Sequence, residues 1–503
     1  MISRLFEKEG NPKKNNPNSS GEFIIIYFLG FLPVIYSLIR AYSLSFTHDE
    51  SLTYNLFSTQ TFWEIITYKS GSANIHLLNS LLMEVFGYIF NDAEFFLRLP
   101  VVIAHGLYVY YFIKIFRLFN LSPFQSLIGV ILINANPYFL EFFSLARGYG
   151  LGHGLLIIMI YYYLAYIKTG INNKRIIAYI ISFFMVISQF VFFYLWTSFV
   201  LADFLITLFY QKKQTVKKLF RHYIIVFPVI LFTLLSVLFP VLSLHEAGQI
   251  KSRWVSGFWN NTVRSFIDGF LLHEPTESQF TFSMILLVII LLFIFTSLII
   301  LVTSKNTRKN PVYFILLVLL AGTPLLSILH NSITGAEFLV YRKTLFFYPI
   351  LTINLLLISL RQNKSFKCII AYPFLSVVST ILLIHTVFNI NTRYAAEWKY
   401  DASTKEMLND LKEINKKDNG KKPVVLGITW YFEPTINYYI KSRNLQWIKP
   451  VNRYSTPKLY DYFYLKNSYY YPHEISADTL QIIKNYPISD TFLAKINHQH
   501  PHE

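Results

Sequence analysis

The residues best suited to acid–base chemistry are the adjacent carboxylates Asp49 and Glu50, which follow the first long apolar run of the chain. A carboxylate placed where a helix leaves the bilayer can accept the proton of an incoming hydroxyl group as a general base. A structural role is also open, because Thr47 and Glu50 have the T-x-x-E spacing of a helix capping box. In that alternative both acids lie in the first helical turn, where the helix dipole favours negative charge.

The segment Asn74–Ser80 carries a second pair of polar residues, His76 and Asn79. The imidazole of His76 can bind a ligand or transfer a proton near neutral pH. Asn79 follows three residues later and therefore shares a helix face with His76. The alternative is that both side chains lie on the solvent face of an amphipathic helix.

A third group lies in Glu141–Gly150, between two apolar runs, and contains Glu141, Arg147 and Tyr149. An arginine at the lipid boundary is costly unless it is paired, which favours a ligand-binding role for Arg147 over a simple ion pair with Glu141. Glycines at every second position permit close approach of helices or of a ligand; they are Gly148, Gly150, Gly152 and Gly154.

The basic pair Arg342 and Lys343 directly precedes another apolar run. A planar guanidinium group donates two parallel hydrogen bonds to phosphate, so we expect this pair to bind a ligand phosphate. The alternative is that both side chains extend to lipid headgroups.

Nothing in the sequence has the spacing of a metal site. Cys368 is the only cysteine, which excludes an intramolecular disulfide and a cysteine-based metal centre. Glu64, Glu84 and Asp92 share one loop, but they lack the spacing of known ligand motifs. The sequence therefore establishes no cofactor, and a divalent metal stays open although no ligand spacing supports it.

The composition is that of a membrane protein. The 503 residues are 53% hydrophobic and only 15% charged, with mean hydropathy +0.40, which is typical of a polytopic α-helical membrane protein. The net charge of +17 comes from short Lys and Arg clusters between apolar runs, a distribution that argues against a nucleic-acid partner.

A helix needs about 20 mostly apolar residues to cross a bilayer. By this rule we predict eleven transmembrane helices, the first of them an uncleaved span that follows a polar tail, 1–21. The eleven segments are 23–45, 99–118, 124–141, 149–167, 176–191, 194–210, 222–243, 281–303, 311–330, 344–360 and 369–389.

Basic residues gather at alternate connections of these segments, where Glu7, Glu9 and Glu22 are the only acids. By the positive-inside rule this side faces the cytoplasm. The N-terminus is therefore predicted inside, and the C-terminal region outside, a plasma (inner) membrane.

The non-spanning parts are also patterned. Helical apolar spacing predicts amphipathic outer-surface helices in the loops 46–98 and 244–280, the latter including Arg253, Trp254 and His273. After the membrane domain, 22–391, charge returns, and 392–503 is predicted to form a small α/β domain on the outer face. Its markers are an amphipathic helix at 405–412, a buried strand at 423–428 and a helix opened by Pro434.

These groups fit one reaction at the outer membrane surface. A polyprenyl-phosphate sugar would keep its tail in the bilayer while Arg147, Arg342 or Lys343 bound its phosphate and stabilised the charge that develops on departure. Asp49 would take the proton of the acceptor hydroxyl, so that a single displacement inverts the anomeric centre.

The same motifs resemble a known family. The acid pair after the first span, Asn74 with His76 and Asn79, Phe95–Pro100, Ala146–Gly150 and Tyr341–Arg342 are similar to GT-C membrane glycosyltransferases. The resemblance is narrower to bacterial members related to protein O-mannosyltransferases and aminoarabinose transferases (glycosyltransferase family 39-like), and it covers roughly 22–390.

The resemblance implies a bacterial enzyme with a polyprenyl-phosphate-linked donor, outer-face chemistry and inversion, with Asp49 as the base and Glu50 in support. His48 departs from the pattern, because many relatives have a small or different residue there. No loop matches a known acceptor-binding segment, which leaves the acceptor open among protein, lipid and glycan.

Two other functions remain as alternatives. A transporter or polysaccharide flippase would place ionisable groups near the bilayer midplane and often contains inverted repeats, neither of which the sequence shows. A cell-envelope polysaccharide assembly factor or polymerase would use 392–503 to bind its partners.

Overall fold

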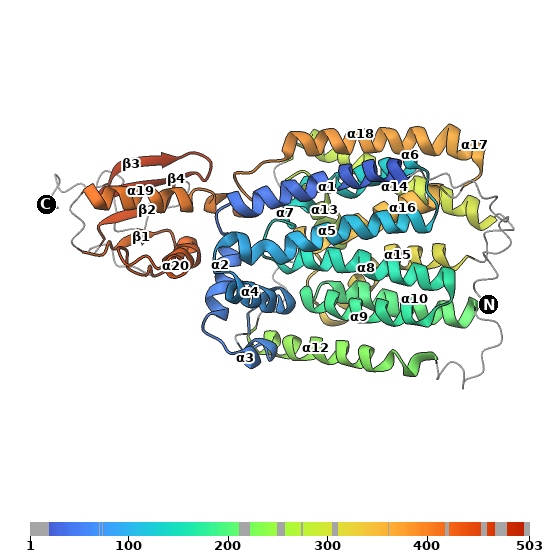
Figure 1. Cartoon of the computed structure of the whole chain (residues 1–503), viewed down its shortest axis with the longest axis horizontal. Coiled ribbons are helices and arrows are strands. Elements are labelled where there is room, and N and C mark those ends of the chain that lie inside the picture. Colours follow the sequence, from blue (N-terminus) through green and yellow to red (C-terminus); the bar gives the residue numbers. More distant parts are fainter. Residues whose placement is uncertain are drawn as a thin grey trace. The chain divides into compact units, whose positions relative to one another are not determined.

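The computed structural model is mostly helical and carries one small sheet (Figure 1). It describes residues 20–69, 71–72, 74–210, 222–248, 257–272, 275–303, 310–360, 362–417, 422–453, 460–467 and 480–496. The predicted tail 1–21 therefore lies almost wholly outside the described residues, as do Arg253, Trp254 and His273. Contacts divide the chain into two units: 1–37, 67–79 and 101–390 in the first, and 38–66, 80–100 and 391–503 in the second.

Long apolar helices dominate the first unit and lie side by side in Figure 1. Among the described residues, eight helical segments are long and apolar enough to cross a membrane, which confirms a multi-pass α-helical membrane protein. The helices that contain them are α1 (Ser20–Ser43), α5 (Glu94–Leu118), α8 (Gly148–Thr169), α10 (Phe192–Tyr210), α12 (Phe227–Glu246), α14 (Glu277–Thr303), α15 (Pro311–Thr334) and α18 (Tyr372–Asn389) with the turns before it.

The other three predicted spans are helical but shorter. The 124–141 segment is divided into α6 (Pro123–Asn134) and α7 (Pro137–Glu141), because Asn136 caps a new helix that begins at Pro137. The remaining two are α9 (Asn172–Ser188) and α16 (Phe347–Leu360). The number of eleven crossings stays a prediction.

The glycines of α8 lie against other backbone and ring atoms of the first unit. A Cβ on Gly148 would lie 1.8 Å from the carbonyl oxygen of Ser188, and one on Gly154 would lie 2.7 Å from that of Ala104. The predicted close approach is therefore between segments of the protein itself, since no side chain fits in these gaps.

A buried ion pair joins α9 and α10. Asp203 accepts hydrogen bonds from Arg175, at 2.6 Å for the shortest, and from the hydroxyl groups of Tyr163, Tyr179 and Tyr223. These donors satisfy the carboxylate, as a buried charge requires.

The second unit begins with the end of α1 and contains short helices from the predicted outer loop 46–98. They are α2 (His48–Phe57), α3 (Phe62–Ile66) and most of α4 (Leu77–Ile89). In the loop 244–280, the structure describes η2 (Trp259–Val263) and α13 (Arg264–Phe270), which belong to the first unit.

The C-terminal part of the second unit has the predicted α/β character. Its amphipathic helix is α19 (Thr404–Lys417), and Pro434 lies in the first turn of α20 (Glu433–Ser442). The strand order β1-β2-β4-β3 pairs β1 with β2 in parallel and the rest antiparallel. The strands are β1 (Leu426–Ile428), β2 (Tyr462–Lys466), β3 (Leu480–Tyr486) and β4 (Thr491–Ile496).

Candidate functional site

The first turn of α2 carries the acid pair, and the predicted capping box is present. The carboxylate of Glu50 accepts hydrogen bonds from the backbone N–H and the hydroxyl of Thr47, both at 2.9 Å. The hydroxyl oxygen of Thr47 in turn accepts the backbone N–H of Glu50. The local T-x-x-E signal therefore sets where α2 begins.

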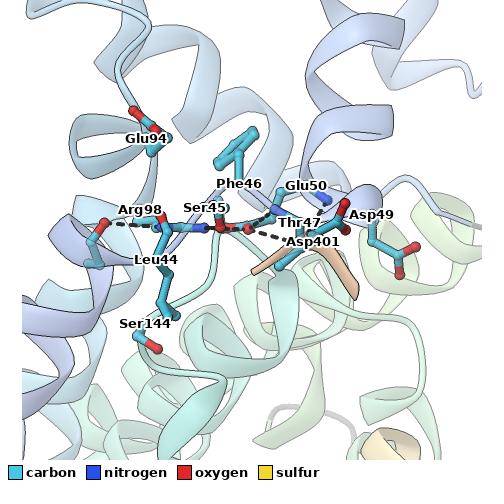
Figure 2. Close-up of polar contacts among 12 residues, drawn as sticks. Leu44, Ser45, Phe46, Thr47, Asp49, Glu50, Glu94, Arg98, Ser144 and Asp401 are labelled. Carbon is cyan, nitrogen blue, oxygen red and sulfur yellow. Dashed lines mark hydrogen bonds and ion pairs between the residues drawn. The ribbon is translucent and has the colours of Figure 1, made fainter. Parts of the chain in front are cut away.

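Glu50 also forms a buried ion pair with Arg98 of α5 (Figure 2). Arg98 donates from Nε to one carboxylate oxygen at 2.8 Å and from a terminal nitrogen to the other at 2.7 Å. Its remaining N–H groups bond the carbonyl oxygens of Ala41, Leu44 and Ser45. A guanidinium has five N–H donors, so those of Arg98 are fully used.

This arrangement separates the roles of the two acids. Glu50 is completely buried and holds Arg98, whereas Asp49 is half-buried. Figure 2 shows the Asp49 side chain extending to the side opposite Arg98. Asp49 is therefore the better candidate base, and Glu50 is a structural support for the helix that carries it.

Two partners of this turn were not predicted from the sequence. Arg98 lies in the Phe95–Pro100 motif, where a charged residue at the start of a span signals a need for a counterion. Asp401, from the C-terminal segment, accepts the backbone N–H of His48 at 2.6 Å, and no sequence signal connects residues so far apart.

The first unit brings together four of the predicted binding residues. Asn79 donates to the carbonyl oxygen of Ala146 at 2.9 Å, and Arg147 donates to that of Asn74 at 3.3 Å. These bonds fix the 74–79 segment against the start of α8. His76, Asn79, Arg147 and Tyr149 are all buried there.

Arg342 joins this group through Tyr149. The Tyr149 ring lies 5.4 Å from the His76 ring, edge to face, and 6.0 Å from the guanidinium carbon of Arg342. Arg342 lies in η3 (Tyr341–Thr344), which begins with Tyr341 at φ 46°, an uncommon conformation for a non-glycine residue. We call His76, Arg147, Tyr149 and Arg342 the basic cluster.

The charges of the basic cluster act on His76. Burial lowers the pKa of His76 well below 6.5, and the positive charges of Arg147 and Arg342 lower it further, while a hydrogen bond with Gln189 opposes the shift. His76 is therefore neutral at physiological pH, and the cluster carries its positive charge on the two arginines.

The other predicted binding residues lie at different positions. Glu141 is buried at the end of α7. Lys343 is partly exposed, with its ammonium group 3.9 Å from a carboxylate oxygen of Glu337. A pair this long and exposed contributes little to stability. Among the residues that the structure describes, no three His, Cys, Asp or Glu side chains are placed to hold a metal ion.

No family model and no curated protein matches the chain. Two solved structures of ArnT from Cupriavidus metallidurans are similar to it. The apo form has 11% identity and TM-score 0.45, over 95% of this chain and 98% of that one. The form bound to undecaprenyl phosphate has 12% identity and TM-score 0.44, over 96% of this chain and 100% of that one. ArnT is an aminoarabinose transferase, one of the groups that the motifs resemble. Since both TM-scores are below 0.5, residue roles must come from this chain's own geometry.

Proposed function

We propose that the protein is an inverting glycosyltransferase that uses a polyprenyl-phosphate sugar donor at the outer face of the membrane. The observation that carries this proposal is the basic cluster, where Arg147 is buried and Arg342 stands over Tyr149. The planar fork of a guanidinium group suits a phosphate, which it can bind through two parallel hydrogen bonds. A lipid-borne sugar phosphate combines such a group with an apolar tail.

An apolar groove in the same unit suits such a tail. It has a volume of about 420 Å³ and lies among η2, α13, α14, α15 and the start of α16, within the size range of small-molecule sites. Phe347 lines it and follows Arg342 by five residues in the sequence, and α13, which also lines it, packs against η3. One residue that lines the groove is thus close in sequence to Arg342 of the basic cluster.

Transfer needs a base as well as a phosphate site. In the proposed reaction the acceptor oxygen forms a bond to the anomeric carbon while the bond from that carbon to the phosphate oxygen breaks. Asp49 takes the acceptor proton, and the polyprenyl phosphate leaves with its charge stabilised by Arg147 and Arg342. Attack from the face opposite the phosphate inverts the anomeric configuration.

The test replaces Asp49 by Asn in the full-length protein. Cells that produce either form are compared by mass spectrometry of polyprenyl-phosphate sugars and of envelope glycans. We expect transfer to fall about 10²- to 10⁴-fold, the usual loss for a missing general base, with donor accumulating. Glu64→Gln is the control, because Glu64, like Asp49, is an acid in the first turn of a short helix, where it forms a second T-x-x-E box with Thr61.

Two outcomes would contradict the proposal. Unchanged glycans in the Asp49→Asn strain would show that Asp49 is not the general base. Movement of a polyprenyl-phosphate sugar across liposomes containing the purified protein, without transfer to any acceptor, would favour a flippase instead.

A further inference from the structure

Helix α2 depends on the C-terminal segment of the second unit. It has only 10 residues, fewer than an isolated helix needs to be stable in water. Its own sequence provides one capping box and little apolar surface. Contacts from outside the helix must therefore hold it in place.

The C-terminal segment contacts both ends of α2. At the start, His48 donates its backbone N–H to Asp401 at 2.6 Å, and its ring nitrogen Nδ1 lies 2.7 Å from the carbonyl oxygen of Tyr431. Towards the other end, Asn55 donates to the carbonyl oxygen of Pro434 at 2.9 Å. Helices α2 and α20 consequently pack together.

The chain just before α2 is held by the same segment. The backbone N–H of Phe46 donates to the hydroxyl of Tyr439 at 2.8 Å. The Phe46 ring stacks on that of Tyr438 with centroids 4.2 Å apart. These contacts fix the direction in which the chain enters the helix.

Asp401 has the central place among these contacts. It is buried, and its other carboxylate oxygen accepts the hydroxyl of Thr435 at 3.1 Å. Burial raises its pKa, and so do the nearby charges of Asp49 and Glu50, against the opposing effect of the His48 and Thr435 hydrogen bonds. The hydrogen bonds from Thr435 and from an N–H of the first turn of α2 offset part of the cost of burying this carboxyl group.

We propose that Asp401 is a positioning residue for Asp49: by capping the first turn of α2 it fixes the orientation of the adjacent residue. The C-terminal α/β segment then contributes directly to the position of Asp49 and is not an accessory domain. The inference deepens the proposed function and rests on it for the role of Asp49.

The test uses the full-length protein in detergent micelles and compares Asp401→Ala, Asp401→Asn and the control Asp461→Ala. Asp461 makes the same kind of bond in the same segment, but the backbone N–H that it accepts, at 2.8 Å, belongs to Val425, just before β1, and not to α2. The Asn side chain keeps an oxygen that can accept the His48 N–H, so Asp401→Asn is expected to keep the hydrogen bond to α2 that Asp401→Ala removes.

Amide hydrogen exchange is the first measurement and needs no substrate. In Asp401→Ala we expect peptides covering 48–57 to exchange about tenfold faster, while β2 and β4 keep their protection. The Asp401→Asn and Asp461→Ala proteins are expected to exchange like the wild type in 48–57. Unchanged exchange of α2 in Asp401→Ala overturns the proposal, and so does faster exchange of β2 and β4 as well, which would mean a general role in folding.

Transfer activity is the second measurement. Asp401→Ala is expected to lower kcat about tenfold with KM for the lipid donor unchanged, because a misplaced base affects the chemical step and not donor binding. A changed KM with normal kcat overturns the link to Asp49. If the wild-type protein transfers no sugar, the proposed function fails, while the exchange result still decides whether Asp401 holds α2.

Discussion

Arg98 and Glu50 form a bidentate ion pair in which both side chains are fully buried. The pair ties α5 to the first turn of α2, so it sets the position of the candidate base through the residue next to it. Burying two charges is favourable only when every donor and acceptor is satisfied, and the carbonyl oxygens around Arg98 meet that condition.

Replacing Glu50 by Gln is expected to destabilise the protein by about 3–5 kcal/mol, because it leaves the Arg98 charge buried without a counterion. Thermal unfolding in detergent measures the loss. Glu64→Gln, in a more exposed capping box, is expected to cost less than about 1 kcal/mol. Equal losses in the two variants would show that the Arg98 pair adds nothing beyond capping.

Replacing Arg342 by Gln is expected to weaken binding of the proposed polyprenyl-phosphate donor about 10- to 100-fold, the value of one charge-assisted hydrogen bond. Native mass spectrometry or a radiolabelled lipid measures the affinity. Arg264→Gln is the control, since Arg264 is exposed and pairs with Asp268 at 3.8 Å. Equal affinity in the wild-type and Arg342→Gln proteins would place the lipid phosphate elsewhere.

His76 makes the stability pH-dependent. Its folded-state pKa lies well below 6.5, so below about pH 6.5 the unfolded chain binds a proton that the folded protein does not. The free energy of unfolding should therefore fall as the pH drops below about 6.5, the unfolded-state pKa of His, and be retained above it.

Thermal unfolding of the wild type and of His76→Gln across this range tests the effect of His76. The variant is expected to lose most of the pH dependence, and His245→Gln, at an exposed histidine, to keep it. Parallel curves for the wild type and His76→Gln would mean that other groups take up the proton.

Gly148→Ala is expected to prevent correct packing of α8 against the end of α9, because the new Cβ would lie 1.8 Å from a backbone oxygen. Backbone atoms cannot move aside as a side chain does, so the folded yield should fall sharply. Gly21→Ala, where no atom lies within 4 Å, is expected to change stability by less than about 1 kcal/mol. Size-exclusion chromatography of both proteins measures the folded fraction.

The parts of this structure that sequence could predict are local. Apolar runs predicted the long helices because the thickness of a bilayer sets the length of a spanning helix. Thr47 and Glu50 predicted the start of α2 because a capping box needs only two residues three positions apart. Even so, Asn136 and Pro137 divide one predicted span, since a strong N-cap outweighed the apolar pattern.

The partners of the candidate site are not local. Arg98 is 48 residues from Glu50, and Asp401 is 353 residues from His48. The sequence marked Glu50 only as a cap or a supporting acid, because nothing in a single chain shows which distant cation neutralises it. The basic cluster was easier to predict, since His76, Arg147 and Arg342 each stood out as polar residues beside an apolar run.

The distance in sequence between α2 and the residues that hold it also orders events in time. The ribosome adds His48 long before it adds Asp401 and Tyr439. The contacts that these two residues make with the start of α2 therefore form only after most of the chain has been synthesised. A nascent or truncated chain carries both acids together with the Thr47 cap and Arg98, but it lacks the contacts from Asp401 and Tyr439. The last segment therefore adds the final contacts on the first turn of α2 only after the rest of that turn's partners have been synthesised.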